Sequence, residues 1–195
     1  SKVDYQFNYI NFLAPGLVIM TMMQNAFANT SSSILGSKMQ GNIVDLLMPP
    51  LNPNEIIISY ISAALIRSIL VGLITYLVIF PFTSLVLNNF IIIIIYSLLG
   101  SIFLALLGLM AGIWSEKFDN MSGITNFIIT PLTFLSGTFY SINRLPEPFY
   151  TISLWNPFYY IIDGFRAAFY QSVDSNLVYG ITYLSMLNLI MYIIC

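Results

Sequence analysis

The sequence predicts an all-α integral membrane protein, a polytopic helix bundle, on three observations. Of its 195 residues, 58% are hydrophobic and only 7% are charged, whereas a soluble domain carries about a quarter charged residues. Uncharged runs follow one another along the chain, and several exceed the roughly 20 residues that a membrane-spanning helix needs. Short polar segments with proline or glycine separate these runs. We therefore expect a single transmembrane domain, residues 1–195.

The first expected span, residues 9–35, lies in a stretch without charge between Asp4 and Lys38. Pro15 and Gly16 lie near its start, where a proline costs a helix least. Its second half is polar, with amide and hydroxyl side chains: Gln24, Asn25, Asn29, Thr30 and three serines. Such side chains favour a helix that faces other helices rather than lipid.

Residues 37–55 form the longest polar interruption of the chain. They contain a helix-like segment, GNIVDLLM, followed by the doublet Pro49-Pro50 and by Pro53. A residue before proline avoids the right-handed helical region, so this short helix is expected to end near Met48. We interpret the segment as a short helix at the membrane surface that contacts another chain.

The next uncharged run, residues 68–115, would be about 70 Å long as one helix. The hydrocarbon core of a bilayer is only about 30 Å thick, so the run must fold back on itself. Pro81 and the Asn88-Asn89 pair predict the turn and give spans at residues 57–80 and 90–113. In the second span, small residues at three- and four-residue spacing predict a face that approaches another helix closely: Ser101, Ala105, Gly108 and Gly112.

Arg67 is the only charge in residues 56–114. It could line a substrate path or pair with a buried carboxylate. Alternatively, it could extend to the cytoplasmic interface, because an arginine at the bilayer centre costs about 2.5–3.5 kcal/mol. The sequence leaves both interpretations open.

Residues 121–141 are the fourth expected span. Pro131 lies in its interior and Gly137 near its end. Proline removes a hydrogen bond from the helix ladder, so we expect this span to be kinked or unwound there. The last run, residues 176–195, is expected to be the fifth span.

Residues 144–174 are rich in aromatic residues and prolines, and they contain no uncharged stretch of span length. This composition is typical of the membrane–water boundary or of helices that dip into the membrane and return. Asn156 is expected to cap the second of two short helices, with Pro157 at its first position. Asp163 and Arg166 are three residues apart and are expected to pair, either as a lock on a gate or as an ordinary interfacial ion pair.

No catalytic or metal site is predicted. Histidine is absent, which removes the commonest metal ligand and the usual general base. Cys195 is the only cysteine, so no disulfide can form within the chain. Ser115 and Lys117 lie in a short turn without a visible oxyanion donor, so a serine–lysine dyad is not expected. With a net charge of −2 and no basic run, no nucleic-acid partner is predicted.

Four segments resemble one known family. FLAPGLVIMTMMQNAFAN and the following SKMQGNIVDLLMPPLNPNEII resemble the permease subunits of type-2 ABC exporters, bacterial proteins that move polysaccharides, lipid-linked glycans, drugs or nodulation factors outward. PLTFLSGTFYSINRLPEPF and NPFYYIIDGFRAAF are similar to the fifth span of that family and the re-entrant helices after it. The resemblance extends over nearly the whole chain, with the motifs in the family's order and spacing.

The resemblance implies a six-span permease in the bacterial cytoplasmic (inner) membrane, in contact with membrane lipid. It would work as a homodimer, with ABC ATPase subunits that bind ATP and Mg. The present sequence would then be a fragment with five spans, preceded by an amphipathic helix and a first span. No cofactor is expected in this chain, because it contains no GxxxxGK[ST] loop for ATP.

The resemblance also implies where the functional residues lie. Residues 37–55 become the cytoplasmic coupling helix that docks on the ATPase, and the residues expected to couple are Asn42, Asp45, Leu46 and Leu47. Residues 144–174 become an extracytoplasmic re-entrant segment. The expected gate residues are Pro131, Gly137, Asn156, Pro157, Asp163 and Arg166. Charge alone does not assign the sides, because lysine and arginine occur on both.

The predicted function is therefore the membrane subunit of an ATP-driven exporter that works by alternating access, and not an enzyme. Its substrate would be a glycan, a lipid-linked molecule or a drug-like compound. Two alternatives remain open from the sequence. One is a membrane enzyme that acts on lipid or lipid-linked sugar, for which Glu116 and Asp119 are the only close carboxylate pair. The other is a scaffold protein in a membrane complex.

Overall fold

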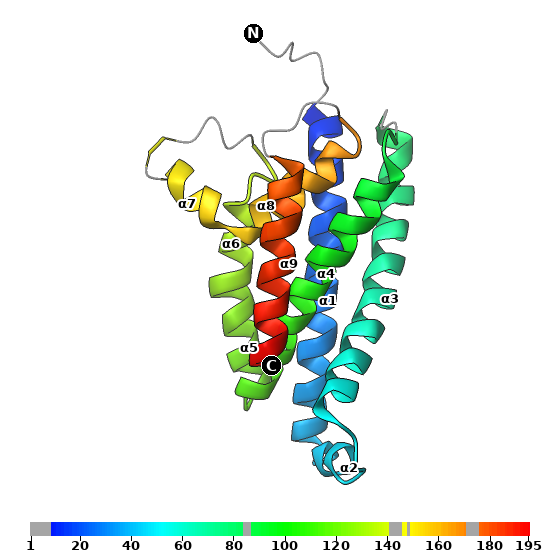
Figure 1. Ribbon diagram of the computed structural model, residues 1–195, viewed down its shortest axis with the longest axis vertical. Coiled ribbons are helices and arrows are strands. Elements are labelled where there is room, and N and C mark those ends of the chain that lie inside the picture. The colour runs from blue at the N-terminus through cyan, green and yellow to red at the C-terminus, as the bar shows by residue number, and fades with distance from the viewer. Residues whose placement is uncertain (1–8, 84–86, 141–145, 148, 171–175) are drawn as a thin grey trace.

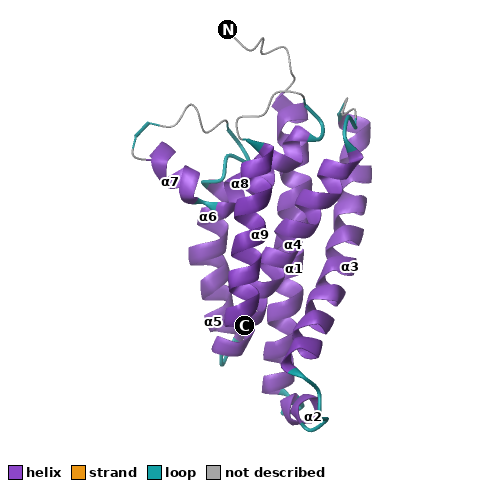
Figure 2. Cartoon of the chain, viewed as in Figure 1, coloured by secondary structure: helices purple, strands orange, loops and turns teal. Residues whose placement is uncertain are grey.

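The computed structural model describes residues 9–83, 87–140, 146–147, 149–170 and 176–195. The side chains of Tyr9, Leu46 and Leu47 lie outside this description. Within these ranges the chain forms helices joined by turns and contains no strand (Figures 1 and 2). The predicted fold class, an all-α polytopic membrane protein, is confirmed.

Four helices of the described residues are long and apolar enough to cross a membrane: α1 (Tyr9–Met39), α3 (Pro53–Ile79, with the 3₁₀ turn η1 at Phe80–Phe82), α4 (Phe90–Trp114) and α9 (Leu177–Ile194). They overlap the segments expected as spans at residues 9–35, 57–80, 90–113 and 176–195. Figure 1 shows them side by side along the long axis of the bundle. Large apolar side chains are exposed on the outer faces of α3 and α9, as a lipid environment requires: Ile66, Leu70, Ile74, Leu77, Met186, Leu189 and Ile193 among them.

The segment expected as a span at residues 121–141 is not one continuous α-helix. It consists of α5 (Phe118–Ile124), a π-helical turn η2 (Thr125–Ile129) and α6 (Thr130–Phe134). Pro131 cannot donate a backbone hydrogen bond, and the wider turn ends two residues before it, at Ile129. The helix ends at Phe134, three residues before Gly137, whose φ of 78° is in the left-handed region. The expected interruption of this segment is present, but the helix is shorter than expected.

The main contact of the bundle joins α1 to α4. It depends on the small-residue face predicted for α4. A Cβ atom at Gly108 would lie 2.1 Å from Oγ1 of Thr30 and 2.5 Å from the Phe27 carbonyl oxygen, so only glycine permits this approach. The hydroxyl of Ser31 donates to the Phe27 carbonyl at 2.7 Å, which satisfies a buried polar side chain within its own helix. The polar second half of α1 is therefore compatible with burial among helices.

Three short helices occupy opposite ends of the bundle. Helix α2 (Ile43–Leu47) lies beyond one end, whereas α7 (Phe149–Trp155) and α8 (Pro157–Ala167) lie at the other (Figure 1). The predicted end of the first short helix near Met48 is confirmed, because Met48 caps α2 just before Pro49-Pro50. Since α1 runs from one end to the other and is about 45 Å long at 1.5 Å per residue, it connects the two groups of short helices.

Candidate functional site

Helix α2 projects from the bundle and exposes apolar side chains. Val44 is 55% exposed and Met48 is 75% exposed. Asn42 and Asp45, both expected to couple to an ATPase, are exposed as well. The side chain of Asn42 donates to Gln40 and not to the helix that it precedes, so it remains on the surface. This end of the molecule therefore presents a mixed apolar and acidic surface.

Leu46 and Leu47 complete the expected set of coupling residues. Their backbone belongs to α2, but their side chains lie outside the described part of the structure. Their predicted role in contacting an ATPase stays a prediction.

Lys38, in the last turn of α1, joins the α2 end of the molecule to the end of α4. Its ammonium group donates to the carbonyl oxygens of Ile113 at 2.7 Å and Ser115 at 2.6 Å. Carbonyl groups at the end of a helix have no partner within the helix, and a lysine there satisfies them. Lys38 therefore joins the end of α1 to the turn between α4 and α5.

At the opposite end, Asn156 separates α7 from α8 and caps α8. Its Oδ1 accepts a hydrogen bond from the Phe158 backbone at 3.0 Å, and its Nδ2 donates to the Leu132 carbonyl at 2.8 Å. Pro157 occupies the start of α8, as the sequence predicts. The second bond connects the two short helices to α6, one residue from Pro131.

Arg166 is the most enclosed cation of the described residues, with 8% of its surface exposed. Its guanidinium donates to the carbonyl oxygens of Gly137 and Thr138, each at 3.3 Å. It also lies 3.9 Å from the ring centroid of Phe12, an arrangement that a cation–π attraction favours. Arg166 thus brings together α8, the turn after α6 and the start of α1.

Asp163 is buried, with 5% of its surface exposed, one turn before Arg166 in α8. The expected pairing of these two residues stays a prediction. The expected gate residues therefore fall into three places: Gly137 beside Arg166, Asn156 beside the residue after Pro131, and Asp163 and Pro157 within α8.

Three residues at this end were not predicted as functional: Phe12, Gly16 and Thr138. A Cβ atom at Gly16 would lie 3.2 Å from a guanidinium nitrogen of Arg166, so the glycine makes room for the cation. The Pro15-Gly16 pair is a visible signal in the sequence, but its partner lies some 150 residues away in α8. No local pattern connects them.

Comparison with known proteins identifies the family. The family model described as "ABC-2 type transporter" matches residues 1–170. The chain is 34% identical over 189 residues to the inner membrane transport permease YadH of Escherichia coli K12, covering 97% of this chain and 74% of that protein. YadH of Shigella flexneri matches with the same identity and coverage. The chain belongs to the ABC-2 type transporter family.

This ABC-2 permease is thus a multi-pass bacterial inner membrane protein and a transport subunit of an ABC system. The family implies an ATPase partner on another chain or domain. Within the described residues, no cluster of three acidic or cysteine side chains could hold a metal ion. The Glu116 and Asp119 side chains, considered for the enzyme alternative, are exposed; Glu116 lies between α4 and α5, and Asp119 in the first turn of α5.

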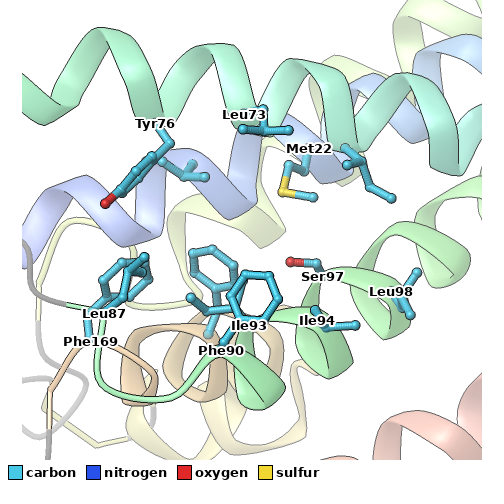
Figure 3. Close-up of a pocket in the computed structure, with 14 residues that line it drawn as sticks. Met22, Leu73, Tyr76, Leu87, Phe90, Ile93, Ile94, Ser97, Leu98 and Phe169 are labelled. Carbon is cyan, nitrogen blue, oxygen red and sulfur yellow. The ribbon is translucent and has the colours of Figure 1, made fainter.

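The ABC-2 permease also contains an apolar cavity of about 350 Å³ between α1, α3, α4 and the end of α8 (Figure 3). Met22, Leu73, Tyr76, Ile93 and Phe169 are among its lining residues. Figure 3 shows the side chains of α3 facing those of α4 across this space. The described residues that line it are mostly apolar and uncharged, so it suits apolar groups.

After α8, Tyr170 anchors the chain to the start of α1. Its hydroxyl donates to the carbonyl oxygen of Asn11 at 2.7 Å. Burial raises the pKa of Tyr170 above its ordinary value, an effect that the nearby Arg166 charge partly opposes. The phenol therefore remains protonated and able to donate at physiological pH.

Proposed function

We propose that this chain is the permease of an ATP-driven exporter that works by alternating access as a homodimer with two ATPase subunits. The observation that carries the proposal is the placement of α1. One of its ends continues into the exposed helix α2, and its other end contacts the buried Arg166 site. One continuous helix thus connects a surface suited to a motor with the segment expected to act as the outer gate.

The proposed cycle begins on the ATPase subunits, which supply ATP binding and hydrolysis with Mg. Their closure displaces α2 through Asn42, Val44, Asp45 and the two leucines. Lys38 transfers part of this displacement to the turn between α4 and α5, because it bonds the carbonyl oxygens there. The rest of the displacement moves α1, including its opposite end.

At the outer end, α1 bears on Arg166 through Phe12 and Gly16. Movement of α1 relative to α8 changes the contacts of Arg166 with the carbonyl groups of Gly137 and Thr138. Packed contacts of this kind have few alternative arrangements, so a small shift is converted into two distinct states. The segment from α6 to α8 then opens toward the outside and releases the substrate.

The test uses the full-length permease expressed with its ATPase and reconstituted in liposomes. The proposal expects co-purification of two permeases with two ATPase subunits and ATP-dependent movement of a glycan, lipid-linked or drug-like substrate from the ATPase side. Purification without an ATPase would contradict it and would favour the lipid enzyme or the scaffold. Transport toward the ATPase side would contradict the outward direction but not the role as a permease.

A further inference from the structure

A polar groove of about 430 Å³ lies between α1 and α3. On α3 it is lined by Arg67, Leu70 and Val71, which share one face because they are three and four residues apart. Ile69, Gly72, Leu73 and Tyr76 lie on another face of α3 and line the apolar cavity of Figure 3. The polar groove and the apolar cavity are therefore separate sites on the two flanks of one helix.

The groove contains a cation without a neutralising charge. Arg67 is exposed, and its guanidinium donates to the amide oxygen of Asn29. Across the described parts of the chain, this is its only hydrogen bond, and no carboxylate pairs with it. A guanidinium has five N–H donors, so most of its capacity remains available to a ligand.

The opposite wall of the groove includes Asn25, whose amide oxygen is enclosed behind the wall. The amide oxygen of Asn25 is buried, and no described residue donates a hydrogen bond to it. Buried polar atoms normally have a partner, and an unpaired one calls for an explanation. Asn25, Asn29 and Ser32 follow one face of α1, so the groove presents amide and hydroxyl groups to whatever enters it.

The position of Arg67 along α3 bears on whether the groove faces the membrane interior or its surface. Arg67 lies near the middle of α3, about 21 Å from Pro53 at 1.5 Å per residue. Its guanidinium bonds the amide oxygen of Asn29 in α1, which favours a site between the two helices over one at the cytoplasmic interface. Charged side chains inside a membrane face a bundle interior or a water-filled cavity, and they mark substrate pathways.

We propose that the groove formed by Asn25, Ala28, Asn29, Ser32 and Arg67 is a water-accessible anion-binding site on the transport route. Its ligand is an organic anion, with a carboxylate, phosphate or sulfonate on Arg67 and polar groups beside Asn29 and Ser32. The placement of this site on a transport route rests on the proposed function. If both hold, the exported substrate carries a negative charge. The anion site itself is tested without transport.

The experiment measures the reaction of one cysteine in the groove with charged thiol reagents. Ala28→Cys is placed in a Cys195→Ser background of the full-length permease with its ATPase in liposomes; residue 28 lines the groove, is exposed and tolerates a small change. The anionic reagent MTSES should react at least about ten-fold faster, relative to its rate with free cysteine, than the cationic MTSET, because a cationic cleft concentrates anions. Arg67→Gln should abolish this preference, and Arg67→Lys should retain most of it.

Ile69→Cys is the matched control, since residue 69 lies at almost the same depth on the flank that lines the apolar cavity. It should react with neither charged reagent, but with a membrane-permeant maleimide. If Ala28→Cys behaves like Ile69→Cys, or if Arg67→Gln leaves the preference unchanged, the anion site is overturned. Retention of the ATPase in the same preparations reports separately on the proposed function.

Discussion

At one end of α1 the short helix α2 exposes Val44, Asp45 and Met48, whereas at the other end α8 is buried from Phe158 to Ala167. Both are short helices, but only α8 has its apolar side chains covered by its own chain, because it packs against α1, α4 and α9. Apolar side chains exposed beyond the membrane need a partner, because exposed apolar patches mark interaction sites. The exposed α2 thus supports the proposed contact with an ATPase, whereas the buried α8 contributes to the packing of its own chain.

This difference predicts that changes near α8 reduce the stability of the permease, whereas changes near α2 reduce its coupling to the ATPase. Two glycines give the largest expected contrast. A Cβ atom at Gly164 in α8 would lie 2.1 Å from the ring of Tyr96, which is completely buried, whereas a Cβ at Gly36 near α2 would meet no atom within 4 Å.

Gly164→Ala should therefore destabilise the permease by about 1–3 kcal/mol or more, as overpacked cores do. Gly36→Ala should be neutral or stabilising by up to about 1 kcal/mol, because alanine favours a helix over glycine. Thermal unfolding of the purified proteins in detergent measures both. Equal midpoints for the two variants would show that the α8 end is not packed as described.

The second contrast compares Arg166 of α8, which contacts the start of α1, with Lys38 in the last turn of α1. Arg166→Gln should cost about 1.5–3 kcal/mol, since it removes charged hydrogen bonds to two carbonyl groups in a buried site. Arg166→Lys should recover only part of this, because an ammonium group does not reproduce the planar guanidinium over Phe12.

Lys38→Gln should cost less, about 1 kcal/mol, because its site is partly exposed. It should, however, weaken the stimulation of the ATPase while leaving the ATPase bound, since Lys38 links α1 to the end of α4. Thermal unfolding and ATPase assays on the same preparations separate the two effects. A larger stability loss for Lys38→Gln than for Arg166→Gln would contradict the claim that the α8 end contributes more to stability than the α2 end.

The smallest stability contrast concerns two helix caps. Asn156 accepts from the backbone of Phe158 and also donates to Leu132, whereas Asn176 accepts from Val178 at the exposed start of α9. Asn156→Ala should cost about 1–2 kcal/mol, and Asn176→Ala about 0.5–1 kcal/mol. Only Asn156→Ala should also impair transport at matched protein levels, because it frees α8 from α6. Unimpaired transport in that variant would mean that this contact does not serve the gate.

The sequence predicted the fold from features that are local along the chain. Uncharged runs of span length, the prolines after α2 and the Asn156-Pro157 cap all act on neighbouring residues, so their consequences could be read in order. The small-residue face of α4 was also predictable, because helical spacing alone places Gly108 and Gly112 together.

Contacts between distant segments could not be predicted in this way. Arg166 meets Phe12 and Gly16 only because α8 folds back against the start of α1. Lys38 meets the end of α4 because two long helices run side by side. The end of the helix before Gly137 is likewise joined to a distant segment, since the Asn156 side chain donates to the Leu132 carbonyl.

The central claim is that α2 docks on an ATPase, and its most direct test is retention of that subunit by a Val44→Asp/Leu46→Asp variant. Each apolar side chain buried at the contact contributes about 1.5–3 kcal/mol, and each 1.4 kcal/mol changes the affinity about ten-fold. The account predicts that the variant inserts and unfolds like the unaltered permease but retains at least about ten-fold less ATPase. Asn120→Asp, at an exposed position in α5, should retain it fully. Full ATPase retention by the double variant would contradict the account.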